Sequence, residues 1–418
     1  MLPYNASTPV RHPVQFVPMR RLLFAILPFL VAADWPQHLG PTRNGHSSET
    51  GLLRAWPKDG PRVVWQRDVG SGWSGPVVAG ERLILFHRVG DDEVVECLEA
   101  ATGKPVWKSA YRTRYVDEFN FDNGPRATPL IADKSVFTFG ADGDLQAWEL
   151  ESGKKVWGRN INRDYRVPKG FFGAATSPLL VDGKLLLNVG VKTAGIVAFD
   201  IDNGRESWKA SDDAVSYSSP VLAKFGGEEL AIFFTREGLL AVTPRGDIVH
   251  RYSWRPRAHA SVNAATPIVS GDRVYLSTSY ETGAIVLELK RGKLEELWKG
   301  DDILSNHYNT PVLVKDYLYG IDGRQEGGQA RLRCVEWNTG KVRWTKDAFG
   351  CAAIIYADGL LIACIETGEV ALIDPTPDGY KELARAKVLD SPARALPALS
   401  DGRLFIRDGK KLVALAVK

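Results

Sequence analysis

The chain has little methionine, little cysteine and no large excess of either charge. Its 418 residues include 2 Met and 4 Cys, and 53 Lys and Arg stand against 50 Asp and Glu. A net charge of +3 argues against a nucleic-acid partner, which would need a basic face, so we expect no such partner. After residue 33 the sequence also lacks any apolar run of the roughly 20 residues that a membrane-spanning helix requires. We therefore expect no transmembrane segment in the mature chain.

Glycine, proline and tryptophan are plentiful by contrast, at 40, 24 and 12 residues. This mixture disfavours a helical protein and fits many short strands joined by tight turns. A content of 44% hydrophobic and 25% charged residues is typical of a globular chain. The composition predicts an all-β fold.

The first 33 residues resemble an export signal preceded by a short leader. Met19 and two arginines come first, the run from Leu22 to Val31 is almost wholly apolar, and two alanines precede Asp34. This pattern predicts a secretory signal peptide, with translation starting at Met19 and cleavage after Ala33. A short uncleaved anchor is the alternative, and no cysteine follows the run to signal a lipid anchor. We expect a periplasmic or extracellular protein.

The four cysteines are Cys97, Cys334, Cys351 and Cys364, and no two are adjacent or in a C-x-x-C motif. Cys351 and Cys364 fall in stretches that resemble paired strands, so a disulfide between them is conceivable. Buried free thiols are the favoured interpretation, because a chain of this size can form a large core without disulfides.

Two series of residues recur along the chain with a similar period. Tryptophans spaced 42 to 51 residues apart, mostly after a turn such as Thr102-Gly103-Lys104, form the first series: Trp65, Trp107, Trp157, Trp208, Trp254, Trp298 and Trp344. Prolines that precede an apolar run, all but the last after a small residue, form the second: Pro76, Pro129, Pro178, Pro220, Pro267, Pro311 and Pro397. The last two prolines are two periods apart, so residues 348–389 form a repeat that has lost both its proline and its tryptophan.

One repeat is clear in residues 123–161. Alternating apolar segments start at Thr128, Ser135, Leu145 and Lys155, and turn residues such as Asp142-Gly143 separate them. Such pairs between alternating apolar runs predict hairpins. Four antiparallel strands in a repeat of 40 to 50 residues indicate the blade of a β-propeller.

The count of repeats predicts one closed ring. The last unit, from residue 390, lacks its outer strand, and Arg62–Asp68 can supply it from the N-terminal side. Such closure leaves no unpaired sheet edge. We predict an eight-bladed β-propeller of four-stranded antiparallel blades over residues 62–418, closed by an N-terminal strand. Residues 34–61 form an N-terminal extension and residues 1–33 the leader and signal peptide.

These repeats resemble those of bacterial quinoprotein (PQQ-type) propellers. The shared pattern is small-Pro-apolar, Asp-Gly hairpins, then Ser/Thr/Asn-Gly-Lys/Arg shortly before Trp, as in Thr102 to Trp107. The likeness covers about residues 62–418, and the segment from Trp35 to Gly45 resembles the N-terminal lead of secreted members. Two functional groups share this repeat, and the resemblance implies one or the other. One group comprises PQQ-dependent dehydrogenases of alcohols or sugars. The other comprises non-catalytic proteins such as the lipoprotein of the outer-membrane β-barrel assembly machinery.

Several features oppose the dehydrogenase. Those enzymes stack PQQ on a disulfide of adjacent cysteines and hold Ca²⁺ through oxygen ligands, which that ion requires. This chain has no adjacent cysteines, and Asp122, Asn123 and Asn263 are oxygen donors that nothing marks as a set. No C-x-x-C-H haem motif is present. We assign no catalytic and no metal-binding residues and expect no cofactor, with PQQ and calcium kept for the alternative.

A binding site is expected where the loops before the innermost strands ring the central channel. These loops are rich in aromatic and polar residues, and Trp73, Arg126, Tyr217 and Tyr308 each stand three residues before a proline of the series. Aromatic rings with a few polar groups suit recognition of small molecules or peptides. The predicted ligand-binding rim comprises Trp73, Arg126, Tyr217, Asn263, His307, Tyr308 and Asn309. The alternative is that these residues only plug the channel and bond to one another.

The favoured function is therefore a secreted or periplasmic, non-catalytic propeller that binds a protein or small ligand at its loop-rich channel face. The alternative is a PQQ-dependent dehydrogenase of alcohols or sugars with a reduced site.

Overall fold

The computed structural model describes Met1 and residues 34–418, except residues 260, 326–329 and 391. The predicted signal peptide, with its start at Met19 and its cleavage after Ala33, lies outside the described residues and stays a prediction. All that follows concerns residues 34–418.

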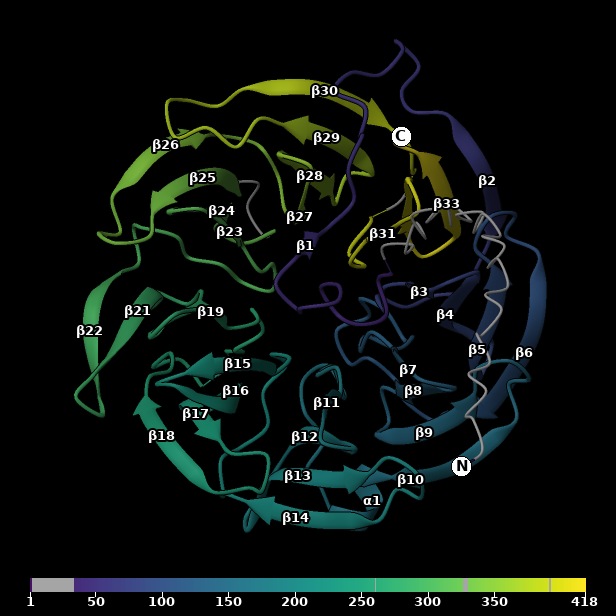
Figure 1. Ribbon diagram of the computed structural model, residues 1–418, viewed down its shortest axis with the longest axis vertical. Coiled ribbons are helices and arrows are strands. Elements are labelled where there is room, and N and C mark those ends of the chain that lie inside the picture. Colours follow the sequence, from purple (N-terminus) through teal and green to yellow (C-terminus); the bar gives the residue numbers. More distant parts are fainter. Residues whose placement is uncertain (2–33, 260, 326–329, 391) are drawn as a thin grey trace. The chain divides into compact units, whose positions relative to one another are not determined.

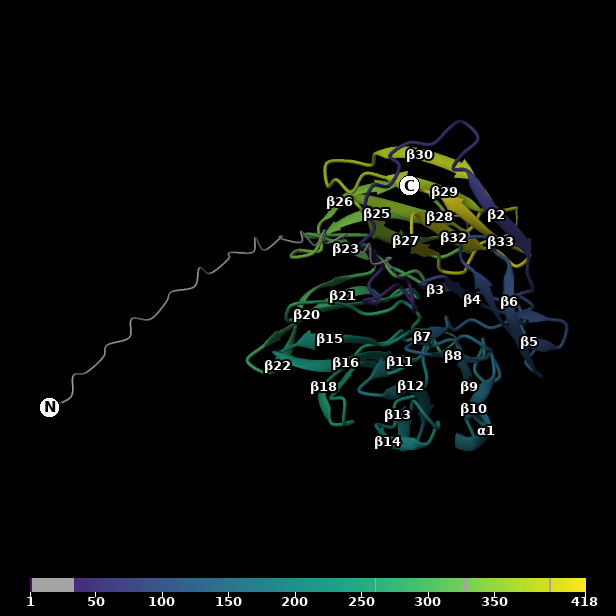
Figure 2. The ribbon, with the colours of Figure 1, turned by 45° about the vertical axis from the view of Figure 1, so that its right-hand side comes forward.

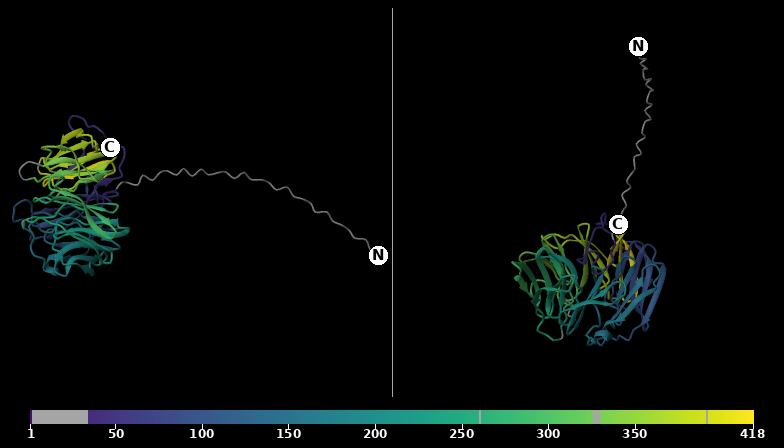
Figure 3. Two further views of the ribbon diagram at one scale, coloured as in Figure 1. Left: turned by 90° about the vertical axis from the view of Figure 1, so that its left-hand side faces the viewer. Right: turned by 60° about the horizontal axis from the view of Figure 1, so that its bottom comes forward.

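The chain from residue 34 forms a ring of eight antiparallel four-stranded blades (Figure 1), as predicted. Figures 2 and 3 show the ring from other sides, with the sheets of neighbouring blades stacked against one another. Blade 1 comprises β3 (Val77–Ala79), β4 (Arg82–Val89), β5 (Asp92–Glu99) and β6 (Pro105–Arg112), and blade 2 comprises β7 (Leu130–Ala132), β8 (Ser135–Phe139), β9 (Asp144–Glu149) and β10 (Lys155–Asn160). Blade 3 comprises β11 (Leu179–Val181), β12 (Lys184–Val191), β13 (Ala194–Asp200) and β14 (Glu206–Ala210), and blade 4 comprises β15 (Val221–Phe225), β16 (Glu228–Thr235), β17 (Gly238–Val242) and β18 (Ile248–Ser253).

The remaining blades continue the order around the ring. Blade 5 comprises β19 (Ile268–Ser270), β20 (Arg273–Thr278), β21 (Gly283–Lys290) and β22 (Lys293–Gly300), and blade 6 comprises β23 (Val312–Val314), β24 (Tyr317–Asp322), β25 (Arg331–Glu336) and β26 (Val342–Lys346). Blade 7 comprises β27 (Ala352–Ala357), β28 (Leu360–Ile365), β29 (Glu369–Ile373) and β30 (Glu382–Lys387), and blade 8 comprises β31 (Ala398–Ser400), β32 (Arg403–Arg407), β33 (Lys411–Ala416) and β2 (Val63–Asp68). A two-residue strand, β1 (His46–Ser47), adds in parallel to β27, and one short helix, α1 (Ile161–Tyr165), follows β10.

The ring closes through the N-terminal strand. Strand β2 pairs antiparallel with β33 and becomes the outer strand of blade 8, with Gln66 opposite Val413. Each proline of the series stands one residue before an innermost strand, where a missing N–H costs no ladder bond. The repeat that has lost its proline and tryptophan is blade 7, whose innermost strand begins at Ala352. The prediction of eight blades with this closure is confirmed.

Six tryptophans of the series make the same contact between neighbouring blades. Each lies on an outer strand and donates its indole N–H to a backbone carbonyl of the next blade at 2.7–3.0 Å, as Trp107 does to Leu150 at 2.7 Å. At five of these tryptophans a turn glycine with positive φ lies against the indole ring, because the Cβ of any larger residue would collide with that ring. Gly153, which lies against Trp107, is an example. These docking tryptophans are Trp65, Trp107, Trp157, Trp208, Trp298 and Trp344.

The assignment of Trp254 to this series is wrong. It lies just past the end of β18, whereas the strand position opposite Ala241, equivalent to Trp157 opposite Ala147, belongs to His250. Trp254 instead stacks on Phe234 of its own blade, with ring centroids 5.9 Å apart. In the next blade, the hairpin that would face a docking tryptophan has only a short turn, between Lys290 at the end of β21 and Lys293 at the start of β22. The spacing of the tryptophans conceals this substitution. Trp254 lies only four residues after His250, so its spacings of 46 and 44 residues to Trp208 and Trp298 stay within the range of the series.

The hydrophobic core lies in layers between the blades rather than at the centre of the ring. One cluster, for example, joins Phe137 and Leu145 of blade 2 to Leu187 and Phe199 of blade 3. All four cysteines are buried and free, including Cys351 and Cys364. This confirms the interpretation as buried free thiols. Burial also raises the pKa of the Cys351 thiol to about 11. Among the described residues, no helix has the length and apolar character needed to cross a bilayer.

The N-terminal segment 34–48 crosses the centre of the ring and contacts successive blades. Trp35 exchanges both backbone hydrogen bonds with Val78 of blade 1, and Pro36 accepts the N–H of Ile131 in blade 2. Further along, His46 bonds to the carbonyl of Leu313 in blade 6 before β1 joins blade 7. This segment therefore closes the channel from one side.

Candidate functional site: the channel pocket

A pocket opens at the centre of the ring, and the repeat itself determines which residues line it. Its empty volume of about 1140 Å³ includes open solvent at the mouth, so the pocket is a concave site that is open on one side. The third residue before each proline of the series lines this channel pocket in all seven cases: Trp73, Arg126, Ala175, Tyr217, Ala264, Tyr308 and Arg394. Because successive residues of an extended chain alternate in direction, the residue directly before the proline also faces inward.

The residues directly before the prolines form the floor. Hydroxyl groups predominate, from Thr128, Ser177, Ser219, Thr266 and Thr310. The backbone N–H of one blade donates to the hydroxyl of a neighbouring blade at 2.9 Å, from Thr128 to Ser177, from Ser177 to Ser219 and from Thr266 to Thr310. This arrangement satisfies buried N–H groups that no strand can pair.

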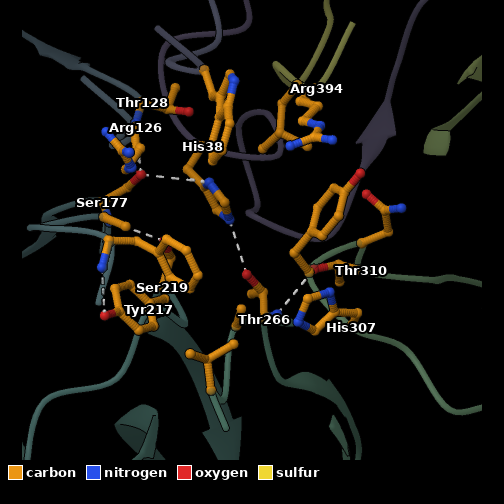
Figure 4. A pocket seen from close by; sticks show the side chains of 18 of the residues that line it. His38, Arg126, Thr128, Ser177, Tyr217, Ser219, Thr266, His307, Thr310 and Arg394 are labelled. Carbon is orange, nitrogen blue, oxygen red and sulfur yellow. Dashed lines mark hydrogen bonds between the residues drawn. The ribbon is translucent and has the colours of Figure 1, made fainter. Parts of the chain in front are cut away.

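His38 of the N-terminal segment completes the floor (Figure 4). Its Nε2 lies 2.9 Å from the hydroxyl of Thr266 and its Nδ1 lies 3.5 Å from that of Ser177. Burial and the nearby Arg43 hold the pKa of His38 well below its usual value. His38 is therefore a neutral residue that links blades 3 and 5.

Arg43 lies beneath this floor, buried to 3% exposure. Its guanidinium donates to the carbonyls of Pro220, Pro178 and Ser177 at 2.8–3.1 Å and to the side-chain oxygen of Gln37. Burial lowers the pKa of Arg43 to about 9. Among the described residues no carboxylate lies within ion-pair distance of it, so its charge is balanced only by dipoles.

Two arginines share the ring of Trp73 in the pocket wall. The guanidinium carbon of Arg126 lies 5.0 Å and that of Arg394 5.1 Å from the ring centroid, distances typical of cation–π contacts. Arg126 also pairs with the buried Asp117 at 3.2 Å, and Arg394 with Glu366 at 2.6 Å. A third guanidinium, that of Arg324, lies 4.4 Å from the ring of Tyr280.

Phenylalanines form a continuous cluster at the mouth of the pocket. Phe119 and Phe121 precede β7, and Phe171 and Phe172 precede β11; their rings lie 5.3–6.4 Å apart. Phe119 and Phe121 are 49% and 46% exposed. Asp117 shapes the first loop by accepting the N–H groups of Phe119 and Phe121. The phenylalanine cluster (Phe119, Phe121, Phe171 and Phe172) is thus presented on an ordered support.

Six of the seven predicted rim residues line the channel pocket. They are Trp73, Arg126, Tyr217, His307, Tyr308 and Asn309. Asn263 does not: it is fully buried, donates to the carbonyl of Thr235 at 2.8 Å, and accepts the N–H groups of Tyr217 and Ser218 through its backbone carbonyl. It supports the rim from behind because it stands four residues, not three, before its proline.

Sequence reasoning missed His38, Arg324, Tyr280 and Arg394, which also line the pocket. Arg394 could have been found, because it is the third residue before Pro397. Tyr280 and Arg324 follow β20 and β24, in loops that the proline series does not mark. His38 comes from outside the repeats, so no periodicity could place it.

The residues present do not fit the calcium and PQQ site of the alternative function. Asp122 uses its carboxylate to accept the N–H groups of Gly72 and Gly124, and Asn123 accepts that of Asp117. Asp122 and Asn123 lie in the loop between blades 1 and 2, whereas Asn263 lies in the loop between blades 4 and 5, three blades further along the ring. Nowhere in residues 34–418, as far as they are described, do three His, Cys, Asp or Glu side chains gather as metal ligands would.

Fold and site together define an eight-bladed propeller whose channel is closed on one side and forms an aromatic, arginine-rich pocket on the other. Comparison with known families identifies the group. The family model for the outer membrane protein assembly factor BamB matches residues 49–166 and 91–346. This match spans well over half of the sequence, and the chain belongs to this family.

Individual relatives are distant. The chain is 22% identical over 294 residues to the assembly factor BamB of Burkholderia pseudomallei, covering 68% of this chain and 72% of that protein. It is 22% identical over 352 residues to that of Yersinia pestis, covering 79% and 82%. Family membership favours the non-catalytic binding propeller over the dehydrogenase, the two interpretations that the sequence left open.

Solved structures share the fold. The crystal structure of BamB from Moraxella catarrhalis matches with a TM-score of 0.62 at 14% identity, covering 85% of this chain and 99% of that one. Quinohemoprotein alcohol dehydrogenase from Comamonas testosteroni matches with a TM-score of 0.67 at 13% identity, covering 92% and 80%. At such identities the likeness concerns the ring of blades alone.

Proposed function

We propose that this protein is an exported, non-catalytic propeller that takes part in the assembly of outer membrane proteins by binding a protein at its channel pocket. The observation that carries the proposal is the family match over residues 49–346. It is supported by a pocket whose wall combines aromatic rings with guanidinium groups, the residue types most enriched where proteins bind one another.

The position of the pocket supports the same role. Its lining comes from loops, which can vary without disturbing the blades that hold them. The phenylalanine cluster beside it exposes neighbouring apolar side chains, and contiguous patches of this kind often mark sites of interaction. A location in the periplasm is part of the proposal, and it is supported by the predicted signal peptide and by the family's name, which refers to the outer membrane.

The proposal is tested by deleting the gene in its host and measuring the amount of folded outer membrane protein, by the gel shift that heating produces. We expect the amount to fall and the intact gene to restore it. A Tyr308→Ala and Trp73→Ala double variant should restore it poorly, whereas Val156→Ala, an exposed change on the outer strand β10, should restore it fully. Unchanged amounts after deletion would contradict the proposal.

A second experiment addresses the dehydrogenase alternative. Purified protein is mixed with PQQ and Ca²⁺ and assayed for dye-linked oxidation of alcohols and sugars. We expect no turnover, because the candidate oxygens do not converge. Saturable turnover would replace the binding function with an enzymatic one.

A further inference from the structure

We propose that the channel pocket binds an acidic, aromatic peptide segment of a partner protein, with a carboxylate against Arg394, in a wall that also holds Arg324, and an aromatic side chain on the phenylalanine cluster. This inference rests on the proposed function, since it supplies the chemistry of the segment that the pocket would bind.

The first observation is the kind of charge that faces the cavity. Three guanidinium groups line it, from Arg126, Arg324 and Arg394, and no Asp or Glu is found among the described residues that line it. Asp117 and Glu366 pair with two of these arginines and are not among the lining residues. As far as its lining is described, the pocket therefore offers a ligand cationic groups and hydroxyls.

Arg126 and Arg394 differ in how many of their guanidinium N–H groups already donate hydrogen bonds within the protein. Arg126 donates to the carbonyls of Gly124 and Asp122 as well as to Asp117, so it holds its loop in shape and is a positioning residue. Arg394 bonds to Glu366 through Nε and Nη2, and no hydrogen bond from Nη1 occurs among the described residues. Its side chain is 17% exposed, which leaves this edge of the guanidinium for a carboxylate.

Arg43 adds a long-range attraction. Its buried charge lies under the floor, and no carboxylate of the described residues is within ion-pair range of it. Together with burial, this charge lowers the pKa of His38, a floor residue. In a site sheltered from water such a charge acts over a longer distance than at the surface. An anion in the pocket would gain from it, whereas a cation would be repelled.

The phenylalanine cluster supplies the apolar half of the site. Phe121 and Phe172 belong both to the cluster and to the pocket lining, so the two surfaces are continuous. Arg394 lies 5.6 Å from the ring of Phe121, which places the expected carboxylate contact beside the exposed rings. A segment in which an aromatic residue neighbours an acidic one can reach both.

The test is calorimetric titration of the propeller with three synthetic peptides blocked at both ends. Gly-Phe-Glu-Phe-Glu-Gly carries both features, Gly-Phe-Gln-Phe-Gln-Gly lacks the charge, and Gly-Ala-Glu-Ala-Glu-Gly lacks the rings. We expect saturable binding of the first, weakened at least tenfold in each of the others. Affinity of the first should fall as salt is raised. Equal binding of the first two peptides would overturn the role of the carboxylate.

Variants locate the binding. Arg394→Gln and Phe119→Ala should each weaken the first peptide at least fivefold. Arg403→Gln, an arginine paired with Asp401 outside the pocket, and Val156→Ala should leave it unchanged. Arg324→Gln serves as a second charge variant if Arg394→Gln unfolds. Unaltered affinity in both charge variants would overturn the proposed site.

Two outcomes separate this inference from the proposed function. If the gene deletion impairs outer membrane protein assembly but no peptide binds, the function stands and the peptide chemistry is wrong. If N-acetylphenylalanine alone binds as tightly as the first peptide, the pocket takes a small carboxylate and the peptide assignment fails.

Discussion

The contacts between neighbouring blades and the channel pocket use the same repeat in opposite ways. At six of the contacts the repeat keeps both the position and the residue, so that an indole N–H reaches a carbonyl of the next blade each time. Around the pocket the repeat keeps only the position. The third residue before the proline is in turn Trp, Arg, Ala, Tyr, Ala, Tyr and Arg. Identical contacts close a ring, whereas a site that recognises one ligand needs different groups around it.

The largest effect should come from removing a docking tryptophan. Trp157→Ala deletes a ring packed on Phe137 and a hydrogen bond to Ile201 at 2.8 Å. We expect a loss of about 3–5 kcal/mol of unfolding free energy, by analogy with other large aromatic truncations, measured by urea denaturation. Trp254→Ala, outside the series, should cost clearly less. Equal losses would mean that the docking contact carries no special weight.

Glu93 makes a polar contact between blades 1 and 2 that depends on pH. It is fully buried, accepts the N–H of Ala141 at 2.8 Å and the hydroxyl of Tyr111 at 2.6 Å, and burial raises its pKa to about 7. The native state thus keeps a proton that the unfolded chain releases near pH 4.5, so stability falls as pH rises between these values. The fall should be on the order of 3 kcal/mol.

Urea denaturation of the parent protein and of Glu93→Gln at pH 5 and pH 8 checks this. The variant lacks the titrating group, so its stability relative to the parent should rise between the two pH values. A constant difference would show that Glu93 does not titrate in this range.

The turn glycines give a smaller, well-controlled effect. Gly153 has a φ of 68°, and a Cβ on it would lie 2.3 Å from the Trp107 ring, whereas Gly183 has a φ of 69° with nothing within 4 Å of its Cβ. Gly183→Ala should cost about 1 kcal/mol for the backbone alone. Gly153→Ala should cost about 1–3 kcal/mol more because the ring must move. Thermal unfolding of the two variants measures the difference, and equal costs would show that the ring yields freely.

The smallest effect on stability is expected at the pocket mouth. Phe119 is half exposed, so Phe119→Ala should change the unfolding free energy by less than about 0.5 kcal/mol. Denaturant titration checks this value. A loss comparable with that of Trp157→Ala would mean that the phenylalanine cluster supports the ring and is not kept for a ligand.

Much of the fold could be predicted from the sequence because each blade carries its own signals. The proline before the innermost strand, the Asp-Gly turns and the tryptophan after its glycine turn are local, and their period gave eight blades. The same logic failed at Trp254, since a residue four positions past the repeat position preserves the spacing almost unchanged. Only the pairing of His250 with Ala241 revealed the substitution.

The site could be predicted where it follows the repeat. Trp73, Arg126, Tyr217 and Tyr308 were brought together because they share one position relative to the proline. Arg394 was missed at that same position, whereas Asn263, one residue away from it, faces the interior.

By itself the sequence determined an all-β ring of eight blades, closed by an N-terminal strand, because turn chemistry and strand alternation act over a few residues at a time. Only the tertiary structure decided what lies at the centre of that ring. His38 and Arg43 belong to a segment without repeats, and their contacts with Thr266, Ser177 and Pro220 span more than a hundred residues of chain. Such contacts leave no local pattern, because they exist only once the ring has closed around the segment.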